Sequence, residues 1–74
     1  MKPIFEIRKY KNLHSKFNEH DDFIRSSDFE LAKTFFFDEA RVSQAYQKII
    51  LVEFQADKAV VWYTFERNYP QTNK

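Results

Sequence analysis

The sequence predicts an α+β domain in which one helix packs on a four-stranded antiparallel sheet, with the elements in the order ββαββ. Three observations support this prediction. The segment 49–65, IILVEFQADKAVVWYTF, holds two runs of β-favouring residues on either side of a polar break. Apolar residues recur at helical spacing in 28–42. Residues 4–10 alternate as a strand does, and 13–24 follow as a weaker strand.

The polar break Gln55–Lys58 is typical of a β-hairpin turn. If the turn holds an even number of residues, alternation along both strands predicts one face as the core: Ile50, Val52, Phe54, Val61, Tyr63 and Phe65. The opposite, outer face then carries four apolar residues: Ile49, Leu51, Val60 and Trp62. A three-residue turn with a bulge is the alternative, and it would place Val60 and Trp62 inside.

An outward apolar patch on a small domain suggests contact with a partner protein. We therefore expect the four residues of the outer face to bind a partner, with Trp62 as the central anchor because Trp is enriched at interface hot spots. The alternative is that a terminus covers part of the patch, or that the register of the hairpin differs.

The first strand is expected at Ile4–Tyr10. The segment Leu13–Ile24 is mostly polar, and we interpret it as an irregular edge strand anchored by Leu13, Phe17 and Phe23. A long loop is the alternative. The choice between a strand and a loop decides whether this segment adds a strand to the sheet.

The helix is expected to run from about Asp28 to Val42, and Ser27 and Glu30 have the spacing of a capping box. Four positions should face the sheet: Phe29, Ala32, Phe36 and Ala40. A second apolar stripe flanks this face: Leu31, Phe35 and Val42. Either Phe17 and Phe23 cover the stripe, or a partner or a second copy of the chain does. A second copy predicts a homodimer.

The composition limits the kinds of functional site that the protein can have. The 74 residues make one domain, for which we expect a polar, frayed tail at 68–74. No cysteine is present for disulfides or thiolate sites, and no glycine for phosphate-cradling loops. The N-terminal stretch is not apolar enough for a signal peptide or a membrane span, so we expect a cytoplasmic protein without a membrane partner.

The sequence shows no catalytic constellation. The cluster Glu19-His20-Asp21-Asp22 has metal-ligating residue types, but neighbours on an extended segment point to opposite faces and do not converge on one ion. We therefore expect neither a metal nor another cofactor, and we expect that the protein is not an enzyme.

Basic residues crowd the first hairpin and suggest an alternative function as a small nucleic-acid-binding module: Arg8, Lys9, Lys11 and Lys16. They are otherwise ordinary charges at a sheet edge. The balance of 12 basic against 11 acidic residues does not favour nonspecific binding of nucleic acid.

Three runs, Phe5-Glu6-Ile7-Arg8, Asp28–Lys33 and Lys48–Glu53, stand in the first strand, the helix and the third strand. In this order of elements the chain resembles small phage- and prophage-encoded proteins that act on host machinery, anti-CRISPR proteins among them. The resemblance implies a non-catalytic inhibitor or adaptor that binds and sterically blocks a larger protein or complex, such as a host defence complex. It transfers no functional residue.

Overall fold

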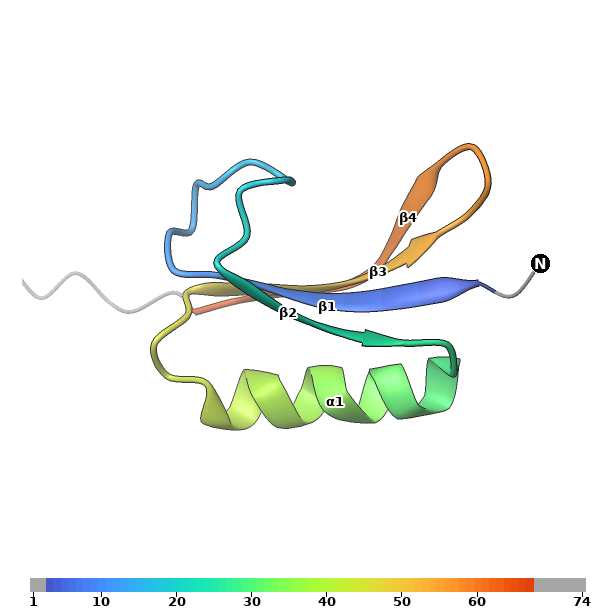
Figure 1. Cartoon of the computed structure of the whole chain (residues 1–74). Coiled ribbons are helices and arrows are strands. Elements are labelled where there is room, and N and C mark those ends of the chain that lie inside the picture. Colours follow the sequence, from blue (N-terminus) through green and yellow to red (C-terminus); the bar gives the residue numbers. More distant parts are fainter. Residues whose placement is uncertain (1–2, 68–74) are drawn as a thin grey trace, which may run out of the picture.

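The structure, a computed structural model, describes residues 3–67 and confirms the ββαββ architecture (Figure 1). The elements are β1 (Ile4–Tyr10), β2 (Asp22–Ser26), α1 (Phe29–Val42), β3 (Lys48–Phe54) and β4 (Ala59–Glu66). All pairings are antiparallel, and the strands lie in the order β2-β1-β3-β4. The tail expected at 68–74 lies outside the described residues.

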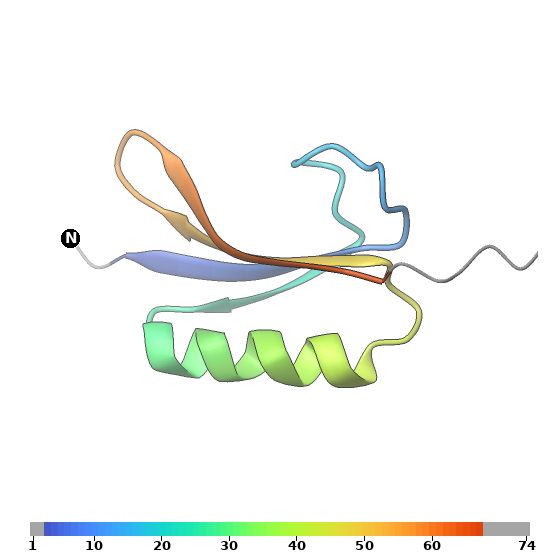
Figure 2. The ribbon, with the colours of Figure 1, turned by 180° about the vertical axis from the view of Figure 1, so that it is seen from behind.

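The sheet is covered on both faces. α1 lies along one face, and the loop 11–21 rises over the opposite face, called here the far face (Figures 1 and 2). The main core beneath the helix contains Phe5, Ile7, Ala32, Phe36, Ile49 and Leu51. A second, smaller core on the far face contains Tyr10, Ile50 and Val52. The central strands β1 and β3 are therefore buried on both sides.

The predicted orientation of β3 was wrong. Ile49 and Leu51 lie under the helix, whereas Ile50 and Val52 belong to the second core. The cause is that a strand covered on both faces is apolar on both faces, so its alternation does not mark a wet side. Glu53 also sits on the helix face, opposite Phe5 and near the end of the strand.

The hairpin turn is even at its tip, as expected, but the alternation breaks further along β4. Phe54 pairs with Ala59, and the register then shifts: Val52 pairs with Val61, and Leu51 with Tyr63. Trp62 is the extra residue of this β-bulge. Val61 therefore shares the far face with Val52, while Tyr63 and Phe65 pack beneath the helix. A bulge does occur, but within the strand instead of at the turn.

The helix spans the predicted residues, but a different residue caps it. Asp28 is the N-cap, and its carboxylate accepts a hydrogen bond of 3.1 Å from the backbone N–H of Glu30. The expected capping box of Ser27 and Glu30 is not what begins the helix. Ala32 and Phe36 are buried against the sheet, which confirms the predicted packing face.

Residues 11–21 form a loop, so only the end of the expected second strand is a strand. Phe17 lies on the far face, where its ring centroid is 6.3 Å from that of Phe54. Phe23 shares this face, because it pairs with Arg8. The expectation that Phe17 and Phe23 cover the apolar stripe of the helix was therefore wrong: the sheet separates them from it.

One pair of leucines tests the corrected assignment of faces. Leu51 is 0% exposed and Leu31 is 47% exposed. We expect Leu51→Ala to lower the free energy of unfolding by about 2–5 kcal/mol, because it leaves a cavity in the main core. The matched change Leu31→Ala should cost less than about 1 kcal/mol. Urea denaturation followed by circular dichroism measures both, and equal effects would contradict the assignment.

Candidate protein-binding surface

A row of aromatic side chains joins α1 to the edge strand β4. The helix packs over β1, β2 and β3, and ring contacts span the remaining distance to β4. We name this row the aromatic seam, and it consists of Phe29 and Phe37 from α1 and Trp62 and Tyr63 from β4. The ring centroids of Phe29 and Trp62 are 5.2 Å apart, and those of Phe37 and Tyr63 are 5.4 Å apart.

Trp62 is held in place although it is 49% exposed. Its ring leans on Phe29, and its indole Nε1–H donates a hydrogen bond of 2.9 Å to Oε1 of Glu53. The polar end of the indole is therefore satisfied within the chain. A partner that covers the open face of the ring would bury apolar surface without leaving this donor unpaired.

Phe37 forms the other exposed part of the seam and is 54% exposed. Its ring contacts the buried Phe36 edge-on at 5.1 Å and lies at a tilt to Tyr63. Between the two aromatic pairs, the ammonium of Lys33 lies 5.7 Å from the centroid of Phe29 and 3.3 Å from a carboxylate oxygen of Glu30. The seam thus combines an apolar surface, backed by the core, with charged groups of both signs beside it.

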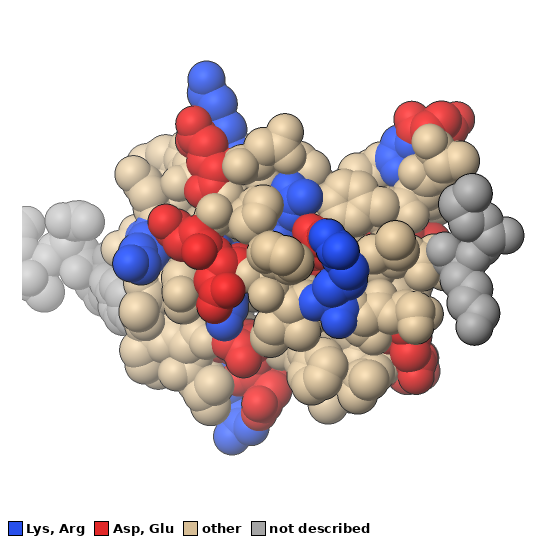
Figure 3. All heavy atoms as spheres, in the orientation of Figure 1, with Lys and Arg blue, Asp and Glu red and all other residues tan. Residues whose placement is uncertain are grey.

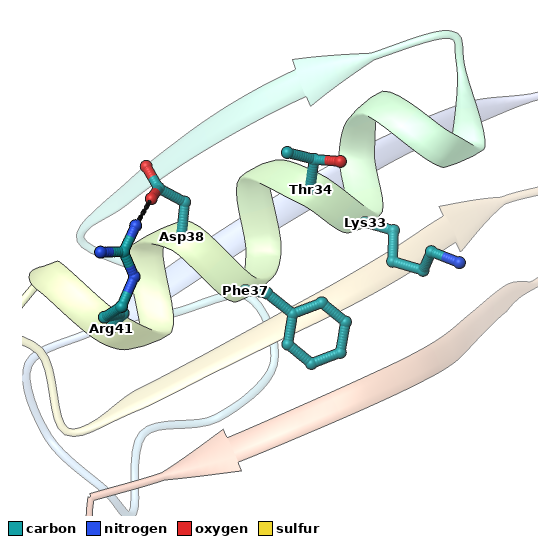
Figure 4. Close-up of a pocket in the computed structure, with 5 residues that line it drawn as sticks. All are labelled: Lys33, Thr34, Phe37, Asp38 and Arg41. Carbon is teal, nitrogen blue, oxygen red and sulfur yellow. Dashed lines mark hydrogen bonds and ion pairs between the residues drawn. The ribbon is translucent and has the colours of Figure 1, made fainter.

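A hollow of about 360 Å³ borders the seam and is lined by Lys33, Thr34, Phe37, Asp38 and Arg41. Figure 4 shows that all five residues come from α1, with Phe37 directed toward the strands and Asp38 joined to Arg41 by an ion pair. Thr34 donates its hydroxyl to the carbonyl oxygen of Glu30. Because one helix supplies every group and the polar groups have partners, the hollow does not bring together a set of catalytic side chains.

The structure separates the four residues of the predicted partner-binding patch. Ile49 and Leu51 are fully buried beneath α1, so their placement on an outer surface was wrong. Val60 is half-buried and pairs with Glu53, on the helix side of the sheet. Only Trp62 has the exposure that a partner would need, because the bulge carries it to the edge of the helix.

Sequence reasoning missed the helix side of this surface. Phe37 stands alone on the flank of the helix opposite the apolar stripe, and that isolated position was the available signal. The stripe itself is divided. Leu31 and Val42 are about half exposed, whereas Phe35 packs against the main core.

The predicted nucleic-acid contacts do not form a common surface, and Arg8 is the clearest case. It is 8% exposed, and its Nε donates to Glu6 at 2.9 Å. Its guanidinium carbon lies 4.5 Å from the ring centroid of Phe17 and 4.9 Å from that of Phe54. Arg8 is thus a paired group beside the second core, and its expected role as a nucleic-acid contact was wrong.

Lys9 points to the opposite face, as the next residue of a strand must. It is buried, with its Nζ 3.0 Å from Glu39 of the helix and 3.4 Å from Asp22. Lys11 and Lys16 are exposed loop residues. The four cations are therefore divided between two faces and a loop, and Figure 3 shows both charge signs interspersed on the drawn face.

Glu6 is the centre of a charged network on the far face. Burial opposes its ionisation, but hydrogen bonds and charge from Arg25 and Arg8 outweigh that effect and hold the pKa of Glu6 below its ordinary value. Arg25 reaches the second carboxylate oxygen at 2.7 Å. Arg8 and the hydroxyl of Tyr10 both donate to the carbonyl oxygen of Phe17, which secures the loop 11–21 over the second core.

Residues 3–67 contain no group of three or more His, Cys, Asp or Glu side chains that could hold a metal ion. His20 lies instead between aromatic rings, with Tyr10 and Phe23 each edge-on to it. Within the same residues no helix combines the length and the apolar character needed to cross a membrane.

Comparison of the chain with protein-family models, with curated proteins and with solved structures found no match. The candidate surface is therefore defined by the geometry of this chain alone. The resemblance to phage-encoded proteins stays a prediction.

The Glu6 network predicts a pH dependence of stability. A carboxylate whose folded pKa is depressed stabilises the fold fully above its unfolded pKa, near 4.5, and this contribution is lost as the pH falls through the folded pKa. We expect Glu6→Gln to cost about 3 kcal/mol at pH 7, because it leaves Arg8 buried without its counter-charge. The difference in stability between Glu6→Gln and the unmodified chain should shrink as the pH falls below 4.5.

Urea denaturation between pH 7 and pH 3 measures this dependence, with Glu66→Gln as the control. That change removes the same charge from an exposed site at the end of β4. If Glu6→Gln lowers the free energy of unfolding by the same amount at pH 7 and at pH 3, the role assigned to the Glu6 carboxylate is wrong.

Proposed function

We propose that this chain is a non-catalytic protein-binding inhibitor or adaptor that engages a larger protein through the aromatic seam. The observation that carries the proposal is the state of Trp62. Its ring is half exposed, held by Phe29 and satisfied at its indole nitrogen by Glu53. Large aromatic side chains that are fixed before binding supply much of the energy of protein interfaces at a small loss of conformational entropy.

The composition of the seam supports a protein as the partner. Its centre is apolar and aromatic, and charged residues of both signs lie beside it, Lys33, Glu30 and Glu53. This arrangement resembles the apolar centre and polar rim of protein interfaces. Nucleic acid would require converging cations that are free to meet phosphates, but Arg8 and Lys9 are engaged by carboxylates.

The action on the partner would be steric. The seam joins the helix to the edge of the sheet, and binding there would cover a surface of the larger protein without any chemical reaction. That the partner is a host defence complex, and that the chain is of phage or prophage origin, are proposals that rest on the order of the elements alone.

Trp62→Ala tests this function. We expect the variant to lose affinity for the partner by about 30-fold or more, the effect of removing a hot-spot residue. The matched control is Val61→Ala, which changes a neighbour with 47% exposure on the far face. It should bind as the unmodified chain does. Affinity capture from the native host identifies the partner, and calorimetry with the purified partner then measures affinity.

Circular dichroism establishes that each variant is folded. If Trp62→Ala does not fold, Phe37→Ala takes its place, because Phe37 is the most exposed ring of the seam. A folded seam variant that captures the partner as well as Val61→Ala does would overturn the proposed function.

A further inference from the structure

We propose that the edge strand β2 and the apolar stripe of α1 together form a two-fold interface with a second copy of this chain. The stripe is Leu31, Phe35 and Val42. At 100° per residue these three lie on one flank of the helix, and Phe37 lies on the other. Because Phe37 contacts β4, at one edge of the sheet, the stripe flanks β2, at the opposite edge. The inference does not rest on the proposed function.

The strand β2 offers an unpaired edge. Within residues 3–67 it pairs only with β1, so every second residue directs its backbone N–H and C=O outward. Above this edge, Leu31 and Val42 are about half exposed on the helix side. Below it, Phe23 is 43% exposed on the far face. Backbone groups and apolar groups are thus both uncovered along one margin of the molecule.

A two-fold axis perpendicular to the sheet places the helices of both copies on the same side of the joined sheet. Such an axis pairs only residues whose side chains lie on the same face of that sheet. With the axis at Arg25, that residue would face Arg25 of the second copy, a like-charge contact. With the axis at Ile24, Phe23 faces Arg25 of the second copy, and Asp22 faces Ser26 of the second copy. Of these two registers, the one at Ile24 forms two complementary pairs and avoids a clash of charges.

The Arg25 side chain is already positioned for this contact. Its Nη2 lies 2.7 Å from the buried carboxylate of Glu6, and its guanidinium carbon is 5.4 Å from the ring centroid of Phe23 in the same chain. In the dimer the same guanidinium would also lie beside Phe23 of the second copy, a cation–π arrangement repeated by symmetry. The choice of a second copy as the occupant follows from this self-complementarity.

Sedimentation equilibrium of the unmodified chain and of Leu31→Glu tests the interface. We expect the unmodified chain to have the mass of a dimer at high micromolar concentration. Leu31→Glu should have the mass of one chain, because it places a charge in the interface. Leu31 suits this purpose better than Phe35, because Phe35 also packs against the main core. A monomeric unmodified chain, or a dimeric Leu31→Glu, would overturn the proposal.

Cysteine cross-linking tests the register, because the sequence has no cysteine of its own. On the two-fold axis, Ile24 faces Ile24 of the second copy, so Ile24→Cys should form a disulfide-linked dimer under mild oxidation. Val61→Cys on β4 is the matched control and should not form a disulfide-linked dimer, because Val61 lies outside the proposed interface. If Ile24→Cys does not fold, a mixture of Asp22→Cys and Ser26→Cys should cross-link more than either alone. Cross-linking through Val61→Cys alone would place the interface on β4 and refute the proposed one.

The two surfaces can be tested separately. Trp62→Ala should leave the mass of the dimer unchanged, because Trp62 lies at the opposite margin of the sheet. Leu31→Glu should still capture the partner of the aromatic seam. If the chain dimerises as expected but Trp62→Ala keeps its partner, the proposed function alone fails. If the unmodified chain is a monomer but Trp62→Ala loses its partner, the dimer alone fails.

Discussion

The ion pair between Glu6 and Arg8 lies on the face of β1 turned away from α1, and the coverage of that face depends on it. Burying either charge alone would be strongly unfavourable, but together they neutralise each other inside the second core. The guanidinium of Arg8 also contacts the rings of Phe17 and Phe54 and donates to the carbonyl oxygen of Phe17. A polar loop thereby closes over a sheet that would otherwise expose apolar residues of β3.

The loop covers one face of the sheet and the helix covers the other, so most of the large exposed apolar side chains lie at the margins of the sheet. One margin carries Trp62 and Phe37, and the other carries Leu31 and Val42. The bulge at Trp62 distinguishes the two margins. Bulges twist an edge strand and hinder the addition of another strand. The edge of β4 therefore suits side-chain recognition, and the regular edge of β2 suits strand pairing.

The sequence was sufficient for the features that depend on local periodicity, namely the order of the elements, the span of the helix and the even tip of the hairpin. It was not sufficient for the choice of faces. Both faces of β3 are apolar, and the bulge lies among Val60, Val61, Trp62 and Tyr63, which all favour strands. Lys9 read as an exposed charge because the carboxylate that meets it lies far along the chain, on the helix.

The candidate site shows the same limit at the scale of one residue. Trp62 was singled out from the sequence as the anchor, but on an outer face that the fold does not have. Its ring partner in the seam, Phe29, comes from the helix, as does Phe37. Phe36 and Phe37 are adjacent in the sequence and chemically identical. A rotation of 100° along the helix separates them, so Phe36 is 3% exposed and Phe37 is 54% exposed. The boundary between the core and the exposed aromatic seam passes between these two residues, and only the packing of α1 on the sheet determines where it falls.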